Sequence, residues 1–220
     1  EETGKDLHLG LEPEPLGWFE TTDETVKFFD RLRSCKGNVY DSVIGVNYDT
    51  CHLAIEFESA ADAVAALRDK NIRISKIHLS SALRLSPSPQ SLRILKDYED
   101  DVYLHQVVAK TKEGTLQRYR DLSDALKYAM SGAECDDEEW RVHFHIPLHS
   151  SPGNQFNDTR DHIEDILALL SSDPSLCQHL EMETYTWEVL PDDLQSGDVV
   201  EQLVREYQWT LERLARVSLA

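Results

Sequence analysis

Basic residues are scarce in this chain. Lys and Arg together number 22 against 41 Asp and Glu among 220 residues, which gives a formal net charge of −19 and a pI near 4.7. Proteins bind a nucleic-acid backbone through clustered Lys and Arg side chains. The composition therefore argues against nucleic acid as a partner, and the acidic surface indicates solubility and repulsion of anionic partners.

Cysteines and long apolar runs are also few. The chain has four cysteines, Cys35, Cys51, Cys135 and Cys177, and no CxxC pair, which fits reduced thiols in a cytoplasmic protein better than a disulfide framework. No apolar run is long enough to span a membrane. The N-terminus has neither a signal peptide nor a Met, and it leads almost at once into an expected strand. We therefore expect an upstream portion of the protein to be missing from this sequence.

Strands and helices alternate along most of the chain, which is typical of a parallel sheet. The expected strands cover residues 7–13, 42–49, 72–81, 140–149 and 178–187. The expected helices cover residues 21–34, 59–70, 87–98, 123–131, 158–172 and 196–217. A hairpin insertion at about residues 101–122 interrupts this order, because two β-prone runs flank the turn signal "KEG". We expect residues 1–220 to form one domain of sufficient length to bury a sizeable core.

The side chains of each main strand separate into an apolar and a polar face. In residues 42–49, Val46 and Tyr48 lie opposite Asn47 and Asp49. Strands of an open doubly wound sheet would be apolar on both faces, whereas a barrel turns one face to its lumen. Outer helices of such a barrel are expected to cover one apolar residue of each strand, namely Leu9, Val46, Ile77, Phe144 and Met182.

An ionisable side chain stands near the C-terminal end of each polar face. The four collected in this way are Glu12, Asp49, His78 and Glu183, with His52 and His145 nearby. Carboxylates that converge repel one another, and carboxylates and imidazoles are costly to bury without partners. A divalent metal ion bound among them removes both costs. Mixed oxygen and nitrogen ligands suit Mn, Co, Mg, Zn or Fe. No cysteine lies on the polar face of a strand, which argues against a closed structural zinc site.

Each of these residues also has an ordinary explanation. Asp49 alone is better explained as the cap of a turn before the next helix, and Glu12 as a solvated strand end. His143 and His145 are equally well explained as satisfied histidines of the lumen, and His105, in the hairpin, is expected at the surface. Only the set as a whole, with one ligand type at the end of each strand, favours a metal site.

Several motifs resemble the xylose isomerase-like TIM-barrel superfamily. They are "EP" at 12–13, "DTCH" at 49–52, "KIHLSSALR" at 76–84 and "METYTW" at 182–187. That superfamily includes sugar epimerases, hydroxypyruvate isomerase and endonuclease IV. More narrowly, "LEPEPLGWFET", "HIPLH" and "ETYTWEVLP" are similar to the EboE family of metabolite-traffic proteins of bacterial Ebo clusters, over essentially the whole chain. The resemblance implies a (β/α)8 TIM barrel, of which this chain would supply the C-terminal five βα units.

The resemblance also implies roles for individual residues. The implied metal ligands are Glu12, Asp49, His78 and Glu183. Glu12 and Glu183 would also be catalytic, as the groups that move the proton. The resemblance gives His52 and Arg84 as substrate contacts, and His145 and Trp18, which lie near strand ends, are expected to contact the substrate as well. Tyr185 and Trp187 are further aromatic candidates for the wall of a sugar site.

The leading functional hypothesis is a divalent-metal-dependent isomerase or epimerase that acts on a sugar-like or cyclitol-like polyol. The alternative is a non-catalytic metal-containing protein that binds or hands over a metabolite, in association with other proteins of an Ebo-type cluster. DNA repair of the endonuclease IV type is disfavoured by the net charge of −19.

Overall fold

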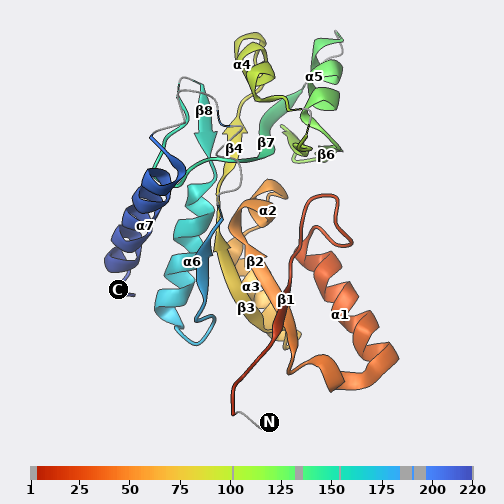
Figure 1. The fold of residues 1–220 in the computed structure, drawn as a ribbon. Coiled ribbons are helices and arrows are strands. Elements are labelled where there is room, and N and C mark those ends of the chain that lie inside the picture. Colours follow the sequence, from red (N-terminus) through yellow and green to blue (C-terminus); the bar gives the residue numbers. More distant parts are fainter. Residues whose placement is uncertain are drawn as a thin grey trace.

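The chain folds as a mixed α/β structure with two sheets, stacked end to end (Figure 1). This computed structural model describes residues 4–100, 102–131, 136–153, 155–183, 190 and 197–219. The strand order is β1-β2-β3-β9 in the first sheet and β6-β5-β7-β4-β8 in the second. In the described part of the chain, no helix is both long and apolar enough to cross a membrane.

The first sheet is parallel throughout. Its strands are β1 (Leu9–Leu11), β2 (Ile44–Asp49), β3 (Ile74–Leu79) and β9 (Leu180–Met182). The helices that accompany them are α1 (Thr22–Lys36), α2 (Thr50–Ile55), α3 (Ala60–Asp69), α6 (Arg160–Ser172) and α7 (Val199–Arg216), with a short 3-10 helix η1 (Gly37–Tyr40). Because all four strands run the same way, their C-terminal ends meet at one edge of the sheet.

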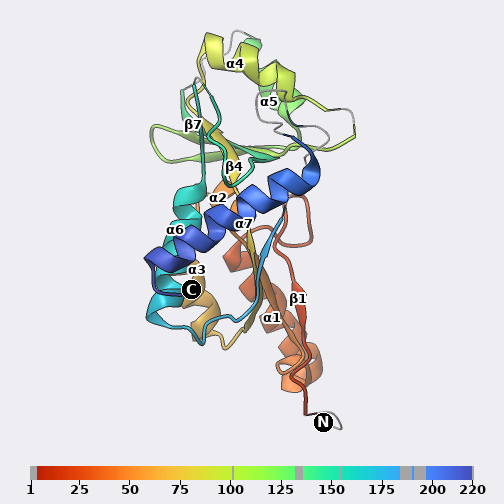
Figure 2. The same ribbon diagram turned by 60° about the vertical axis from the view of Figure 1, so that its left-hand side comes forward.

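One face of the parallel sheet is apolar, as the alternation in the sequence predicts. Val46, Tyr48 and Ile77 are fully buried in a core shared with α1, α3 and α6. Burying a side chain of this size stabilises the fold by about 1.5–3 kcal/mol, so this face holds the sheet to its helices. Figure 2 shows α7 crossing in front of α6 on the outside of this layer. Met182 is partly buried in the same core, but Leu9 is 61% exposed, so the expected helix cover of Leu9 is wrong.

Side-chain caps determine where several of these helices begin. Thr21 and Glu24 form a capping box at the start of α1, and the Ser59 hydroxyl accepts a hydrogen bond from the Asp62 backbone at the start of α3. The Asp49 carboxylate caps α2 in the same way. Such caps satisfy backbone N–H groups that have no partner within the helix.

The second sheet is antiparallel and lies beyond the C-terminal ends of the parallel strands (Figure 1). Its strands are β4 (Ala82–Leu85), β5 (Val107–Thr111), β6 (Leu116–Tyr119), β7 (Asp137–His145) and β8 (Phe156–Asp158). The helices beside it are α4 (Pro89–Leu95), the 3-10 helix η2 (Lys96–Tyr98) and α5 (Leu122–Met130). The predicted hairpin is confirmed as β5 and β6, with Gly114 at φ 85° in its turn, a conformation that favours glycine.

The expected fourth parallel strand, residues 140–149, is wrong in its partners and direction. These residues belong largely to β7, which pairs antiparallel with β4 on one side and β5 on the other. Phe144 is accordingly buried in a second core with Leu83, Trp140 and Val142, away from the helices of the parallel sheet. The described residues therefore show a four-stranded parallel sheet and an antiparallel sheet, and these strands close no barrel.

Candidate metal centre

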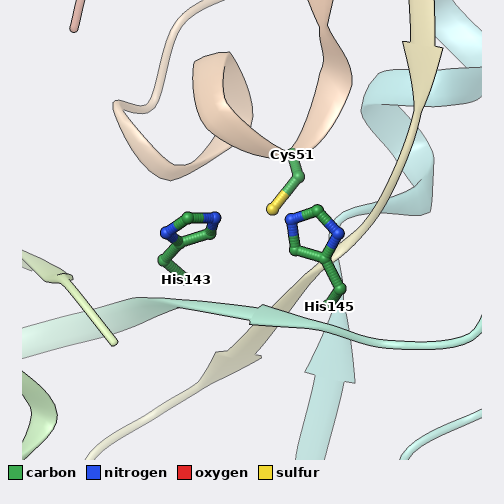
Figure 3. Close-up of side chains that lie close together, drawn as sticks. All are labelled: Cys51, His143 and His145. Atoms are coloured by element: carbon green, nitrogen blue, oxygen red, sulfur yellow. The ribbon is translucent and has the colours of Figure 1, made fainter. Parts of the chain in front are cut away.

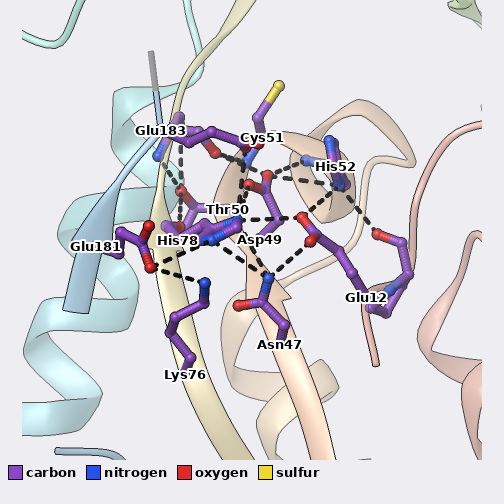
Figure 4. Close-up of polar contacts among 12 residues, drawn as sticks. Glu12, Asn47, Asp49, Thr50, Cys51, His52, Lys76, His78, Glu181 and Glu183 are labelled. Atoms are coloured by element: carbon purple, nitrogen blue, oxygen red, sulfur yellow. Dashed lines mark hydrogen bonds and ion pairs between the residues drawn. The ribbon is translucent and has the colours of Figure 1, made fainter. Parts of the chain in front are cut away.

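The four predicted ligands Glu12, Asp49, His78 and Glu183 come together at the C-terminal edge of the parallel sheet (Figure 4). Asp49 and His78 are register partners on β2 and β3, while Glu12 and Glu183 follow the ends of β1 and β9. One ligand atom from each residue lies within 4.8 Å of one from every other. The four strand ends thus form one site, from residues that span most of the sequence.

A single nitrogen of His78 faces three carboxylates. The His78 Nδ1 atom lies 3.2 Å from Glu12 Oε1, 3.4 Å from Asp49 Oδ2 and 3.5 Å from Glu183 Oε2. A ring nitrogen donates at most one hydrogen. Among the described residues, Asp49 Oδ2 and Glu183 Oε2 are buried oxygens without a hydrogen-bond partner. The site therefore has more buried acceptor oxygens than hydrogens to satisfy them.

The electrostatics of the site reflect this excess of negative charge. Burial opposes a charge on His78, but the nearby Asp49 and Glu12 carboxylates and the charge of Glu183 raise its pKa to about 10. Burial, together with the charge of Asp49, raises the pKa of Glu183 to about 8. Burial also works against ionised Asp49, yet the neighbouring His52 and His78 hold its pKa well below the usual value.

These residues fit a divalent cation. Three carboxylates and one imidazole are ligands that Mn, Mg, Co, Zn and Fe accept. A cation among them would satisfy the two unpartnered oxygens and replace the protons on His78 and Glu183. The unsatisfied buried oxygens are the observation that favours a cation over an ordinary ion-pair network.

Asp49 caps α2 and also faces the other candidate ligands. Its Oδ1 atom accepts hydrogen bonds from the His52 backbone N–H at 2.9 Å and from Ser80 Oγ at 2.7 Å, so it caps α2. Its Oδ2 atom is the one that faces His78. The carboxylate is fully buried and points at the other ligands. The cap explanation and the ligand explanation are therefore compatible, because each uses a different oxygen.

His52 and His145 also lie at this site. His52 is buried, with Nδ1 3.0 Å from the Pro13 carbonyl oxygen and 3.4 Å from Glu12 Oε1. His145 is buried, with Nδ1 3.4 Å from the backbone oxygen of Glu183 and 3.9 Å from its Oε2. Both imidazoles are therefore positioned to contact a molecule bound at the candidate metal centre.

Two other predicted substrate contacts lie apart from this network. Arg84 is on β4, where its Nη1 pairs with Asp161 Oδ2 at 2.8 Å. Trp18 is 84% exposed in the loop after β1. Tyr185 and Trp187 lie outside the described residues. Of the predicted substrate contacts, the structure thus brings His52 and His145 to the metal centre.

The sequence analysis overlooked Asn47 and misplaced His105. Asn47 Nδ2 lies 2.7 Å from Glu12 Oε2 and 3.2 Å from His78 Nδ1; its place on the polar face of β2, two residues before Asp49, is the signal for it. His105 was expected at the surface but is fully buried, with Nδ1 2.9 Å from the His143 carbonyl oxygen. That expectation is wrong because the antiparallel sheet covers His105, which lies two residues before β5.

A groove of about 660 Å³ runs along the polar face of the parallel sheet and reaches the centre. Its lining includes Gly10, Asn47, Lys76, His78 and Glu181. Lys76 Nζ and Glu181 Oε2 form an ion pair of 2.7 Å beside it. A Cβ at residue 10 would lie 3.0 Å from the Asn47 backbone nitrogen, a close approach that favours glycine there.

The candidate centre combines four metal-ligand side chains, the positioning amide of Asn47 and a groove that reaches them, all formed by described residues. No family model, no curated protein and no solved structure matches the chain.

Proposed function

We propose that the chain binds a divalent metal ion through Glu12, Asp49, His78 and Glu183 and acts as an isomerase or epimerase on a sugar-like or cyclitol-like polyol. The observation that supports this most is the position of His78 Nδ1 within 3.5 Å of three carboxylate oxygens from three other strand ends. A parallel sheet in chain order, with the site at its C-terminal edge, also supports a (β/α)8 barrel as the parent fold.

The two glutamates are placed to move a proton. Glu12 follows β1 and Glu183 follows β9, the two edge strands of the described parallel sheet, so they flank the centre. Because a bound cation would displace the proton that Glu183 holds in the metal-free centre, Glu183 would return to the substrate a proton taken up from solvent. Glu12 is then the acceptor for a proton from the carbon next to a carbonyl. The bound cation would supply Lewis-acid chemistry toward the polyol oxygens.

Removal and return of this proton need no oxidant or reductant. One carboxylate takes a proton from carbon, and the electron pair moves toward the neighbouring carbonyl. The other carboxylate returns a proton to the adjacent carbon or to the opposite face. His52 and His145, buried beside Glu12 and Glu183, would orient the hydroxyl groups.

A second candidate function is binding and transfer of a metabolite without catalysis. The Arg84–Asp161 ion pair and the exposed Trp18 favour it, because two residues expected to hold a substrate are not turned to the centre. In that case the centre would bind a polyol for other proteins of an Ebo-type cluster in the cytoplasm. Metal binding by the four ligands is common to both functions.

Replacing single glutamates tests the two functions against each other. Glu12→Gln and Glu183→Gln keep a coordinating oxygen but remove the base. For an isomerase, each variant should retain metal while losing incorporation of solvent deuterium into a polyol by a factor of about 100 or more. The matched control is Glu212→Gln, since Glu212 is an exposed residue of α7 and belongs neither to the groove nor to the four ligands.

The outcomes separate clearly. Deuterium exchange that is lost in both variants and kept in Glu212→Gln supports the isomerase. Metal binding without exchange across a broad polyol panel, in the metal-loaded wild type, supports the binding function. Absence of metal binding in the wild type would refute both.

A further inference from the structure

A second group of metal-ligand side chains lies next to the first. Cys51, His143 and His145 each offer a ligand atom, and these atoms lie within 4.8 Å of one another. All three residues are buried. Figure 3 shows the Cys51 sulfur between the two imidazole rings, with a ring nitrogen of each turned toward it.

We propose that Cys51, His143 and His145 form a second metal site, which binds a thiophilic divalent ion such as Zn²⁺ through one thiolate and two imidazole nitrogens. Thiolate and imidazole are the ligands that zinc prefers. With bonds of about 2.3 Å to sulfur and 2.0 Å to nitrogen, the ligand atoms of a tetrahedral zinc lie roughly 3.3–3.5 Å apart. The three atoms, within 4.8 Å of one another, would close to that spacing by side-chain rotation when a metal binds.

The two sheets contribute different ligands to this site. Cys51 is the second residue of α2, two positions after Asp49 at the end of β2, whereas His143 and His145 alternate along β7. Because side chains two residues apart on a strand share a face, both histidines point the same way. A metal here would join the parallel sheet to the antiparallel sheet that covers it.

The tautomer of His145 is one that can bind a metal ion through Nε2. Its Nδ1 lies 3.4 Å from the Glu183 carbonyl oxygen, which can only accept, so Nδ1 carries the hydrogen. In the neutral ring, Nε2 then carries the lone pair. Metal-binding histidines are commonly oriented by such a hydrogen bond from their other nitrogen.

The protonation of both rings also suits metal binding. Burial and the neighbouring imidazoles hold the pKa of His143 well below its usual value, and burial lowers that of His145 to about 4. Both are therefore neutral at pH 7, the form that binds metal.

A plain packing role explains this group less well. A buried cysteine often behaves as a small apolar side chain, and Cys51 does contact a small cluster with Ile55, Ala82 and Val108. The rings of His143 and His145, however, lie beside its sulfur, and His52 packs against both rings. The His52 ring centroid is 4.8 Å from that of His143 and 6.0 Å from that of His145, and the His143 and His145 centroids are 5.3 Å apart. A cysteine that only packs is expected among apolar side chains, whereas here two imidazoles present nitrogen ligands to it.

This site would change the role of His145. As a zinc ligand, His145 positions Glu183 through its Nδ1 hydrogen bond instead of contacting the substrate. His52 lies between the two centres, with Nε2 3.1 Å from His143 Nε2 and Nδ1 3.4 Å from Glu12 Oε1. The second site would therefore fix the geometry of the first.

Cobalt(II) titration of the 220-residue chain tests the proposal, because cobalt bound to a thiolate gives a sulfur-to-metal charge-transfer band that oxygen and nitrogen ligands do not give. We expect this band in the wild type. We also expect it in His78→Gln, which removes a ligand of the first centre only, and in Cys35→Ser, which changes an exposed thiol. The band should disappear in Cys51→Ser and weaken at least tenfold, at equal cobalt concentration, in His143→Gln and His145→Gln.

Two results would overturn the proposal. One is cobalt binding to the folded wild type without a sulfur band, and the other is a band that persists in Cys51→Ser. Circular dichroism verifies that each variant is folded, and if Cys51→Ser is not, the two histidine variants decide the question. Absence of the band would overturn this proposal alone, because Glu12, Asp49, His78 and Glu183 include none of its three ligands and their metal binding is measured separately.

Discussion

Asn47 donates a hydrogen bond of 2.7 Å from Nδ2 to Glu12 Oε2 and so joins the end of β1 to β2 at the candidate metal centre. The other oxygen, Glu12 Oε1, is the one that faces His78 and His52. Asn47 therefore determines which carboxylate oxygen of Glu12 is turned to the centre. Partners of this kind orient metal ligands without touching the metal.

Replacing Asn47 should weaken metal binding without abolishing it. Asn47→Ala frees the Glu12 carboxylate to rotate, and we expect the affinity for Mn²⁺ or Co²⁺ to fall by about 10- to 100-fold. Isothermal titration calorimetry measures the change. Asn38→Ala, at an exposed position of η1, is the matched control. An affinity equal to that of the wild type would show that Asn47 does not position Glu12.

The two oxygens of Asp49 can be tested separately. Asp49→Asn retains a side-chain oxygen for the cap of α2 but removes a ligand charge, whereas Asp49→Ala removes both. Mg²⁺ or Mn²⁺, which favour oxygen ligands over the thiolate site, should raise the thermal midpoint of the wild type and of neither variant. Without metal, Asp49→Ala should lose about 1 kcal/mol more free energy of unfolding than Asp49→Asn, because it loses the cap. Equal stability of the two variants would contradict the capping role.

An ion pair joins the hairpin to α2, and the stability that is lost when this ion pair is removed should depend on pH. Glu56 is buried, and Arg118 of β6, whose side chain is 42% exposed, donates to its Oε2. Burial raises the pKa of Glu56 even with Arg118 present. Arg118→Met leaves an unpaired buried carboxylate, at a cost of about 1–2 kcal/mol at pH 7, discounted because water reaches Arg118.

This cost should shrink in acid. A carboxyl whose pKa is raised by folding contributes stability below its unfolded pKa of 4.5 and loses that contribution as pH rises through its folded pKa. The gap between the wild type and Arg118→Met, measured by urea unfolding, should therefore narrow as pH falls from 7 toward 4.5. The double variant Glu56→Gln with Arg118→Met should recover most of the stability at pH 7. A gap that widens in acid would refute this explanation.

His162 should make the fold sensitive to mild acid. Its Nε2 lies 2.9 Å from the Tyr48 hydroxyl, and burial, followed by the charge of Arg141, lowers its pKa to about 4. A depressed folded pKa means that the unfolded chain binds the proton first, so stability is complete above pH 6.5 and falls between 6.5 and about 4. With about 1.4 kcal/mol for each pKa unit, the loss is about 3 kcal/mol.

His162→Gln provides the comparison, since Gln can bond to Tyr48 but does not titrate in this range. The free energy of unfolding, measured at several pH values, should fall more steeply in the wild type than in this variant. Other buried histidines affect both proteins equally, so only the difference matters. Parallel curves would show that His162 does not titrate with folding.

The parallel sheet and its polar edge follow from local sequence patterns. Side-chain alternation correctly separates Val46 and Tyr48 from Asn47 and Asp49, because strand geometry alone dictates it. It cannot say which sheet a strand joins. In β7, Val142 and Phe144 alternate with His143 and His145 as they would in a barrel strand, yet β7 pairs antiparallel with β4 and β5.

The cause of this error lies in residues 82–85. The sequence analysis extended one strand to residue 81 and did not expect another to follow at once. Instead, β4 follows β3 after Ser80 and Ser81 and provides an antiparallel edge for β7. Cys51 was overlooked for a related reason. It lies on a helix that begins directly after β2, and only the placement of β7 brings two imidazoles to it.

The pairing of β3 with β9 has a consequence for the order of folding. Ile77 pairs with Leu180, although the antiparallel sheet and α6 lie between them in the sequence. Closing such a long chain segment costs entropy before its contacts form, and non-local parallel pairing is slow. Glu12, Asp49 and His78 can meet through the earlier strands, whereas Glu183 arrives only when β9 docks. We therefore expect completion of the metal centre to be among the last steps of folding, after both cores have formed.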